Sequence, residues 1–217
     1  GLQLRGDAHS YCGTEQKGRW RRLMESILWI VLAYFIGAIP SGYIIGRVFY
    51  GVNLKKVGSG NIGATNAYRE LGVKAGLAVF ICDFMKGFIA VHLGMPDPVI
   101  VLLCAVFAII GNDWSVFLHF KSGKGVACGV GAFTYICAPA VLAAFLVWLA
   151  IFKWKHIVSL GSILAAPVVP LVMLIEGEPL EYVAFGALAA VIVIGKHKDN
   201  IGRLLRGEEK PITREKR

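Results

Sequence analysis

Charged side chains are scarce in this chain of 217 residues. They make up 17% of it, against about 25% in soluble domains, while hydrophobic residues reach 56%. The apolar residues are gathered in long runs, which is typical of an integral membrane protein and excludes an ordinary soluble domain. The five cysteines form no CxxC pair, so no metal site is predicted and no cofactor is expected.

Acidic residues are also few, 14 against 23 Lys and Arg, which leaves a net charge of +9. In a soluble protein this excess would suggest a nucleic acid partner, but no groove-reading motif accompanies it. Most of it lies in short loops and in the C-terminal tail, where anionic headgroups and membrane topology account for it. We therefore expect membrane lipids, and no nucleic acid, as partners.

The apolar runs predict an all-α integral membrane protein. A transmembrane helix needs about 20 apolar residues, and shorter segments occur where helices tilt or break. The run at 126–154 could be one helix bent at Pro139, but reading it as two gives a better loop pattern. The prediction is then seven transmembrane helices, some short or broken, at residues 26–49, 73–94, 98–111, 125–137, 139–152, 157–175 and 180–195.

Basic residues fall in alternate loops of this scheme, and cytoplasmic loops are the basic ones. The loops at 50–72, 112–124 and 153–156 carry Lys or Arg, as does the tail from Lys196, whereas the loops between them carry none. This pattern predicts a cytoplasmic C-terminus and an N-terminus outside.

The N-terminal stretch contradicts the pattern, because three of its arginines would lie outside, next to the first helix. It is polar and lacks the small-residue cleavage site of a signal peptide. We expect residues 1–23 to be a dispensable extension, residues 24–209 to form the membrane domain, and residues 210–217 to be a basic tail.

Two glycine-rich loops occur among the basic loops, at residues 58–66 (GSGNIGATN) and 121–127 (KSGKGVA). Glycines let consecutive backbone N–H groups converge on an anion, and the helix that follows adds a partial positive charge at its N-terminus. Two such loops on one membrane face indicate a reaction between two phosphorylated molecules, or a transfer from one.

Each loop also has a simpler interpretation. The first could be a turn capped by Thr65 and Asn66, although Arg69, one helical turn later, suits bidentate phosphate binding. The second could contain two positive-inside lysines, Lys121 and Lys124. It lacks the Walker pattern and the preceding strand, so ATP is not expected.

Polar pairs also lie at the ends of the last two predicted helices. His197 and Asn200 form an i,i+3 pair just below the membrane, or else belong to a basic amphipathic tail. Ser159 and Ser162 could donate to a ligand or only to backbone carbonyl groups.

Charges inside the second predicted helix have a structural interpretation. Asp83 and Lys86 lie at i,i+3 and predict a buried ion pair. At the outer end of the same helix, His92 and Asp97 fit the H-x4-D pattern of another acyltransferase class. They lie on the opposite membrane face from both glycine loops, so we interpret this match as chance.

The ordered motifs resemble those of bacterial acyl-phosphate:glycerol-3-phosphate acyltransferases of the PlsY family, in the stretches 57–66, 120–127, 158–163 and 197–201. The resemblance implies an acyltransferase that moves a fatty acyl group from acyl phosphate to the 1-hydroxyl of sn-glycerol 3-phosphate. The products would be lysophosphatidate and inorganic phosphate, in the first step of phospholipid synthesis. It also implies a bacterial inner-membrane enzyme with its active site at the cytoplasmic face.

The chain departs from the family pattern around the second loop. Asn112 and Ser115 stand where the family usually has His and Pro, Ser122 replaces a Gly, and Cys128 replaces a Thr. Both lysines of the loop remain.

The resemblance assigns roles residue by residue. Acyl phosphate would be bound by Ser59, Gly60, Asn61, Gly63, Thr65 and Asn66. Glycerol 3-phosphate would be bound by Arg69, Lys124, Ser162, His197 and Asn200. The second loop would be supported by Lys121, Ser122, Gly123 and Gly125.

His197, Lys124 and Asn200 would be the catalytic residues. His197 is a candidate general base, and the substrate's own phosphate, with a second pKa near 6, is its rival. A transporter of a phosphorylated solute is the alternative function, since such proteins also combine broken helices, charges and glycine loops. The clustering of the polar motifs at one membrane face favours the enzyme.

Overall fold

The computed structural model describes residues 3–120 and 122–212, and every regular element within them is helical. This confirms the all-α prediction. The elements are α1 (Gln3–Ala38), α2 (Ser41–Tyr50), η1 (Leu54–Lys56), α3 (Ala64–Leu71), α4 (Val73–Leu93), α5 (Pro98–Asp113), η2 (Val116–Leu118), α6 (Val126–Ile136), α7 (Ala138–Lys155), α8 (Val158–Ala165), α9 (Val168–Ile175), α10 (Leu180–Lys196) and α11 (Lys198–Leu205).

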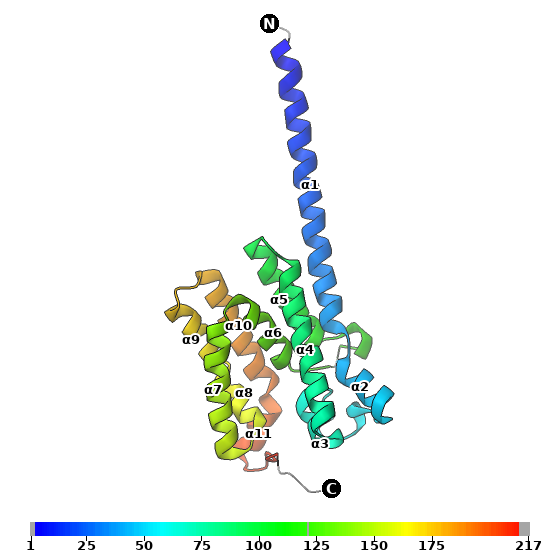
Figure 1. Cartoon of the computed structure of the whole chain (residues 1–217), viewed down its shortest axis with the longest axis vertical. Coiled ribbons are helices and arrows are strands. Elements are labelled where there is room, and N and C mark those ends of the chain that lie inside the picture. Colours follow the sequence, from blue (N-terminus) through cyan, green and yellow to red (C-terminus); the bar gives the residue numbers. More distant parts are fainter. Residues whose placement is uncertain (1–2, 121, 213–217) are drawn as a thin grey trace.

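The helices pack as two groups along the chain. In the first group, α4 packs on α3, α5 and α6, and α5 packs on α1. In the second, α7 packs on α8 and α9, and α9 packs on α10. Figure 1 shows α7, α8 and α9 on the side of the bundle away from α1 and α2. The groups meet mainly through α6, which contacts both α7 and α10.

The first predicted span is two helices, because the chain bends by 40° between α1 and α2. Pro40 disfavours helix at Ile39 and has no N–H group to donate. The bend leaves two carbonyl groups without helical partners. Ser115 Oγ donates to Ala38 O at 2.5 Å, and Lys86 Nζ donates to Ile39 O at 2.5 Å.

Lys86 also pairs with Asp83 at 2.6 Å, and both residues are buried. The predicted ion pair is therefore confirmed, and it has a structural task. Asp83 compensates the charge of the lysine that satisfies the broken helix.

The run at 126–154 forms two helices rather than one. Cys137 between them has the non-helical angles φ −150° and ψ 85°, and Pro139 falls in the first turn of α7, where a missing N–H group costs nothing. Helix α6 has 11 residues and is about 16 Å long, roughly half the hydrocarbon thickness of a bilayer.

Among the described residues, four helical stretches are long and apolar enough to cross a membrane: Val73–Leu93, Pro98–Leu118, Ala138–Lys155 and Val158–Ile175, the last of which joins α8 and α9. The number rises to six if α1 with α2, and α10 with α11, each count as one bent span. With α6 as the shorter apolar helix, the seven predicted segments all correspond to helices. The number of complete crossings and the orientation of the termini stay predictions.

The structure describes part of the expected N-terminal extension and of the expected C-terminal tail, and the domain boundaries after residues 23 and 209 stay predictions. Helix α1 already begins at Gln3, and its N-terminal half extends beyond the bundle as an isolated rod (Figure 1). At the other end, the expected tail still contacts the bundle at its first residues, since Ile212 N donates to His156 O at 2.7 Å.

Candidate active site

A cavity of about 620 Å³ lies between the two groups of helices. One end is polar and includes Ser59, Arg69, Lys124, His197 and Asn200. The remainder is apolar and passes between α6, α7, α9 and α10. A single cavity with a charged end and an apolar arm fits an amphiphilic ligand.

The first turns of α3, α6, α8 and α11, or the residues just before them, line the polar end. The lining residues at these helix starts include Gly63 and Ala64 at α3, Gly125 and Val126 at α6, and Ser159 at α8. Free N–H groups and the helix dipole make each helix start favourable for an anion. The polar end therefore contains the starts of α8 and α11 in addition to the two helix starts that follow the glycine loops. The loop pattern did not predict these two additional helix starts.

Asn66 organises the first glycine loop from inside. Its Oδ1 accepts from Ser59 N at 3.0 Å, and its Nδ2 lies 2.8 Å from Asn61 O and 3.2 Å from both Leu54 O and Val57 O. The residue is 3% exposed. Its amide is therefore fully used in holding the loop, which leaves Ser59 and Asn61 at the cavity.

The second loop is supported by the end of α5. Gly123 N donates to Asn112 O at 3.0 Å, and Gly125 has φ +68°, a conformation that suits glycine. The buried carboxylate of Asp113 lies beneath Gly125 and makes no hydrogen bond among the described residues. Its nearest cation is Lys196, at 3.9 Å.

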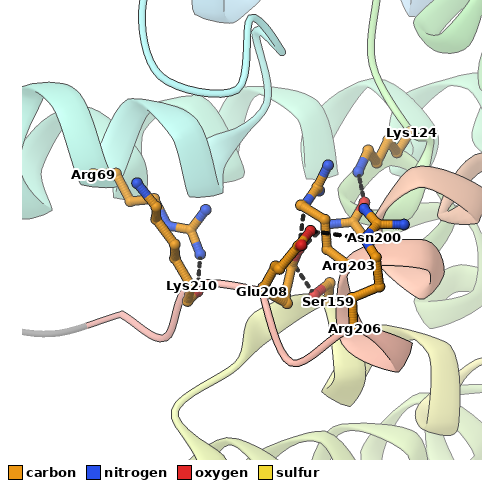
Figure 2. Close-up of polar contacts among 9 residues, drawn as sticks. Arg69, Lys124, Ser159, Asn200, Arg203, Arg206, Glu208 and Lys210 are labelled. Carbon is orange, nitrogen blue, oxygen red and sulfur yellow. Dashed lines mark hydrogen bonds and ion pairs between the residues drawn. The ribbon is translucent and has the colours of Figure 1, made fainter.

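Glu209 links α8 to α11 at the polar end, where Figure 2 shows Ser159, Asn200 and Arg203 close together. Its Oε1 accepts from Ser159 Oγ at 2.7 Å and from Asn200 Nδ2 at 2.6 Å, and its Oε2 accepts from Arg203 Nε at 2.6 Å. Lys124 Nζ donates to Asn200 Oδ1. The amide of Asn200 is thus oriented from both sides, between the second loop and the C-terminal segment.

Burial shifts the pKa values in this cluster. Desolvation lowers the pKa of Lys124 and of His197, and the charge of Lys124 lowers that of His197 further. Burial alone would raise the pKa of Glu209, but its three hydrogen bonds outweigh this and hold its pKa below the ordinary value. At neutral pH His197 is therefore uncharged and Glu209 is ionised.

The hydrogen bonding of His197 defines its tautomer. Its Nδ1 lies 2.7 Å from Val193 O, and a carbonyl oxygen can only accept, so the proton is on Nδ1. The residue is 4% exposed and lines the cavity. In the neutral ring, Nε2 is therefore the nitrogen that can accept a proton.

Arg69 lies on α3, in the first group of helices, and its side chain contacts the C-terminal segment. Its Nη2 donates to Lys210 O at 2.7 Å, and Figure 2 shows the C-terminal segment running from Arg69 to the Glu209 cluster. Sequence reasoning missed Arg203, Glu209 and Ile212, which also line the cavity. The Asn200-to-Arg203 spacing of one helical turn was the available signal for Arg203. Nothing local indicated Glu209.

Most of the predicted site residues converge on the cavity. These are Ser59, Asn61, Gly63, Thr65, Asn66, Arg69, Gly123, Lys124, Gly125, Ser162, His197 and Asn200. Gly60 and Ser122 do not line it, and Lys121 lies outside the described residues. Ser162 Oγ donates to Val158 O at 3.1 Å, and the His92 and Asp97 side chains contact Tyr135 and the start of α5 instead.

The sequence also matches the family model for glycerol-3-phosphate acyltransferase over residues 27–207. The chain belongs to the glycerol-3-phosphate acyltransferase family. It is 45% identical to glycerol-3-phosphate acyltransferase 2 of Moorella thermoacetica, over 84% of this chain and 95% of that protein. It is 38% identical to the glycerol-3-phosphate acyltransferase of Aquifex aeolicus, over 86% of this chain and 98% of that protein.

The fold is shared with crystal structures of PlsY, an integral membrane glycerol 3-phosphate acyltransferase. Its glycerol 3-phosphate form has a TM-score of 0.83 and 37% identity, covering 87% of this chain and 96% of that one. Its lysophosphatidic acid form has a TM-score of 0.80 and 34% identity, covering 87% of this chain and 95% of that one. The protein is thus a multi-pass membrane acyltransferase, and these relatives do not support the transport alternative.

Three departures from the family pattern have structural partners. Ser115, in place of the family's Pro, donates to the orphaned carbonyl of Ala38. Asn112, in place of His, holds the second loop through its backbone. Cys128 is fully buried where α6 meets α4. The backbone carbonyl oxygen of Cys128 lies so close to Gly87 of α4 that a Cβ at position 87 would overlap it.

Proposed function

We propose that this acyltransferase uses acyl phosphate as the donor and the 1-hydroxyl of sn-glycerol 3-phosphate as the acceptor. The observation that carries the proposal is the single cavity, whose cationic end is surrounded by helix starts and whose apolar arm continues into the bundle. The helix starts suit two phosphate groups, and the arm suits a fatty acyl chain.

The donor phosphate would lie at the first glycine loop. Ser59 and Asn61 reach the cavity there, next to the start of α3, with Gly63 and Thr65 beside them. Gly60 would contribute through the positive φ that turns the loop, +71°. Asn66 would act indirectly, by holding the loop in shape.

The acceptor would lie between the second loop and α11. Lys124, Arg69 and Arg203 provide positive charge for its phosphate, and Asn200 provides an oriented amide. Ser162 lies deeper, at the border of the apolar arm. For the phosphate, Arg69 would exchange its bond with Lys210 O for a charge-assisted one.

In the reaction, the 1-hydroxyl oxygen attacks the acyl carbonyl carbon. A new C–O bond forms, the hydroxyl proton passes to a base, and the bond to the phosphate oxygen breaks. Inorganic phosphate leaves, and lysophosphatidate is the other product. Because acyl phosphate is an activated mixed anhydride, the protein mainly positions the two substrates and stabilises charge.

Two groups could take the proton. His197 has its Nε2 free and a lowered pKa, so it is unprotonated at neutral pH. The donor phosphate is the other candidate, with a second pKa near 6. Both would be held at the same end of the cavity.

The test is acyl transfer by the purified protein with acyl phosphate and glycerol 3-phosphate. We expect lysophosphatidate and phosphate in equal amounts, and no product from acyl-CoA. Turnover with a thioester but not with acyl phosphate would contradict the donor assignment. Lys124→Ala is the matched inactive control.

We also propose that the site faces the cytoplasm in the bacterial inner membrane, because the loops around it are basic. Single cysteines at Ser59 and Glu178 test this with an impermeant label on intact cells. We expect label at position 178 only. Label at position 59 only would reverse the topology.

A further inference from the structure

The apolar arm of the cavity has a defined depth. From His197, just after α10 at the polar end, to Gly186, the last lining residue on α10, the cavity extends about 16 Å along the helix. This is close to half the roughly 30 Å thickness of a bilayer's hydrocarbon core, the length that one leaflet's acyl chains occupy. The arm is therefore long enough for an acyl chain of ordinary membrane length.

The lining stops before the far end of each surrounding helix. The last lining residues are Phe133 on α6, Val141 on α7, Val169 on α9 and Gly186 on α10. Directly beyond them lies a buried apolar cluster that includes Met173, Phe185, Cys137 and Ala140. The arm thus ends against packed side chains.

Phe133 is the large side chain shared by the arm and this cluster. It is 5% exposed, and its ring stacks on that of Phe185 with centroids 5.0 Å apart and an interplanar angle of 23°. Phe185 does not line the cavity itself. The Phe133 ring is therefore fixed from behind by a side chain that does not line the arm.

We propose that Phe133 determines the longest acyl chain that this enzyme accepts, by closing the apolar arm. The inference rests on the proposed function, because it places the donor's chain in that arm. A chain that reaches Phe133 gains about 0.8 kcal/mol per buried methylene, or about fourfold in kcat/KM for each. A longer chain meets the Phe133 ring and can bind only with its reacting end displaced, so kcat/KM falls.

The test compares saturated acyl phosphates from decanoyl to arachidoyl as donors for the wild type and Phe133→Ala. We expect kcat/KM of the wild type to rise with chain length and then fall. In Phe133→Ala the maximum should move to longer chains, while decanoyl phosphate should retain activity within about threefold. Phe107→Ala makes the same change on α5, outside the cavity, and should leave the profile unmoved.

A second variant tests the opposite direction. Val130 lines the arm one turn before Phe133 and is half-buried, so Val130→Phe should shorten the arm. We expect its maximum to move to shorter chains, with turnover of decanoyl phosphate preserved. This variant keeps the inference testable if Phe133→Ala does not fold.

Two results would be decisive against these assignments, and they differ. Active variants with the wild-type chain-length profile would show that the chain leaves the arm before Phe133, and the inference would fail. Inactivity of the wild type with every acyl phosphate would instead reject the proposed donor.

Discussion

Glu209 supports a sharp prediction, because it accepts from three donors on two helices, α8 and α11. Replacing it with Gln keeps the shape but turns one acceptor oxygen into an NH2 group. Whichever way the amide turns, this group faces Asn200 Nδ2 or Arg203 Nε, and both of these are donors. One charge-assisted bond is lost, and one donor, either the buried Asn200 Nδ2 or the partly exposed Arg203 Nε, is left without a partner.

The size of the effect follows from those bonds. A hydrogen bond to a charged group contributes about 1.5–3 kcal/mol, and an orphaned buried donor costs about 1–3 kcal/mol. A total near 3 kcal/mol corresponds to about a hundredfold, since 1.36 kcal/mol is tenfold. Because Asn200 is oriented from Glu209 on one side and Lys124 on the other, we expect Glu209→Gln to lower kcat/KM by about that factor.

The matched control is Glu208→Gln. Glu208 is exposed and pairs with exposed Arg206 at 2.8 Å, so its loss should change activity by less than about twofold. The assay is acyl transfer at several glycerol 3-phosphate concentrations, with thermal unfolding measured beside it. If Glu209→Gln stays within about threefold of the wild type in kcat/KM, the network does not position Asn200.

The pH dependence of this network has a defined sign. The pKa of Glu209 is lowered in the folded protein, so its contribution is complete above the ordinary carboxyl pKa. It is lost as the pH falls through the lower, folded value. Glu209 should therefore stabilise the wild type at neutral pH, and its contribution should make the thermal midpoint fall only in acid, below the range where histidine titrates.

Four further predictions concern the site and the N-terminal helix. Lys124→Ala should lose far more activity than Lys124→Arg, because charge is the main requirement; equal losses would contradict this. If His197 is the base, the rate should fall as the pH drops through a value below 6.5, and His197→Asn should lose this inflection; an unchanged inflection would leave the substrate phosphate as the base. Truncation to Met24 should retain specific activity within about tenfold, or about 1.4 kcal/mol in barrier, and a larger loss would show that residues 1–23 matter. Turnover should survive exhaustive chelation, and activity restored only by a divalent ion would reject a metal-free reaction.

Local sequence patterns predicted the helices, and most of the site residues that they predicted line the cavity. The seven apolar runs became helices because a chain in lipid must satisfy its backbone hydrogen bonds internally. The glycine loops and the His197–Asn200 pair were recognisable because anion binding needs bare backbone and short polar side chains close together in sequence. The Asp83–Lys86 pair was predictable because an unpaired charge inside a membrane helix is costly.

Other features depended on contacts between residues far apart in the chain. Lys86 satisfies a carbonyl at the α1–α2 bend, 47 residues away, and Glu209 meets Ser159 across 50 residues. Sequence spacing indicates neither of these two contacts, because the residues come together only when the chain between them has folded. The backbone at Lys210 and Ile212 likewise bonds to residues far away in the chain, Arg69 and His156.

Sequence by itself thus determined the class of protein, its helical elements and the positions of its two glycine loops, since these depend on hydrophobicity and local geometry. The tertiary structure decided which helix starts surround one cavity, which carboxylate orients Asn200, and where the apolar arm ends at Phe133. Those features arise where separate helices pack together, and packing of distant segments has no local sequence signature.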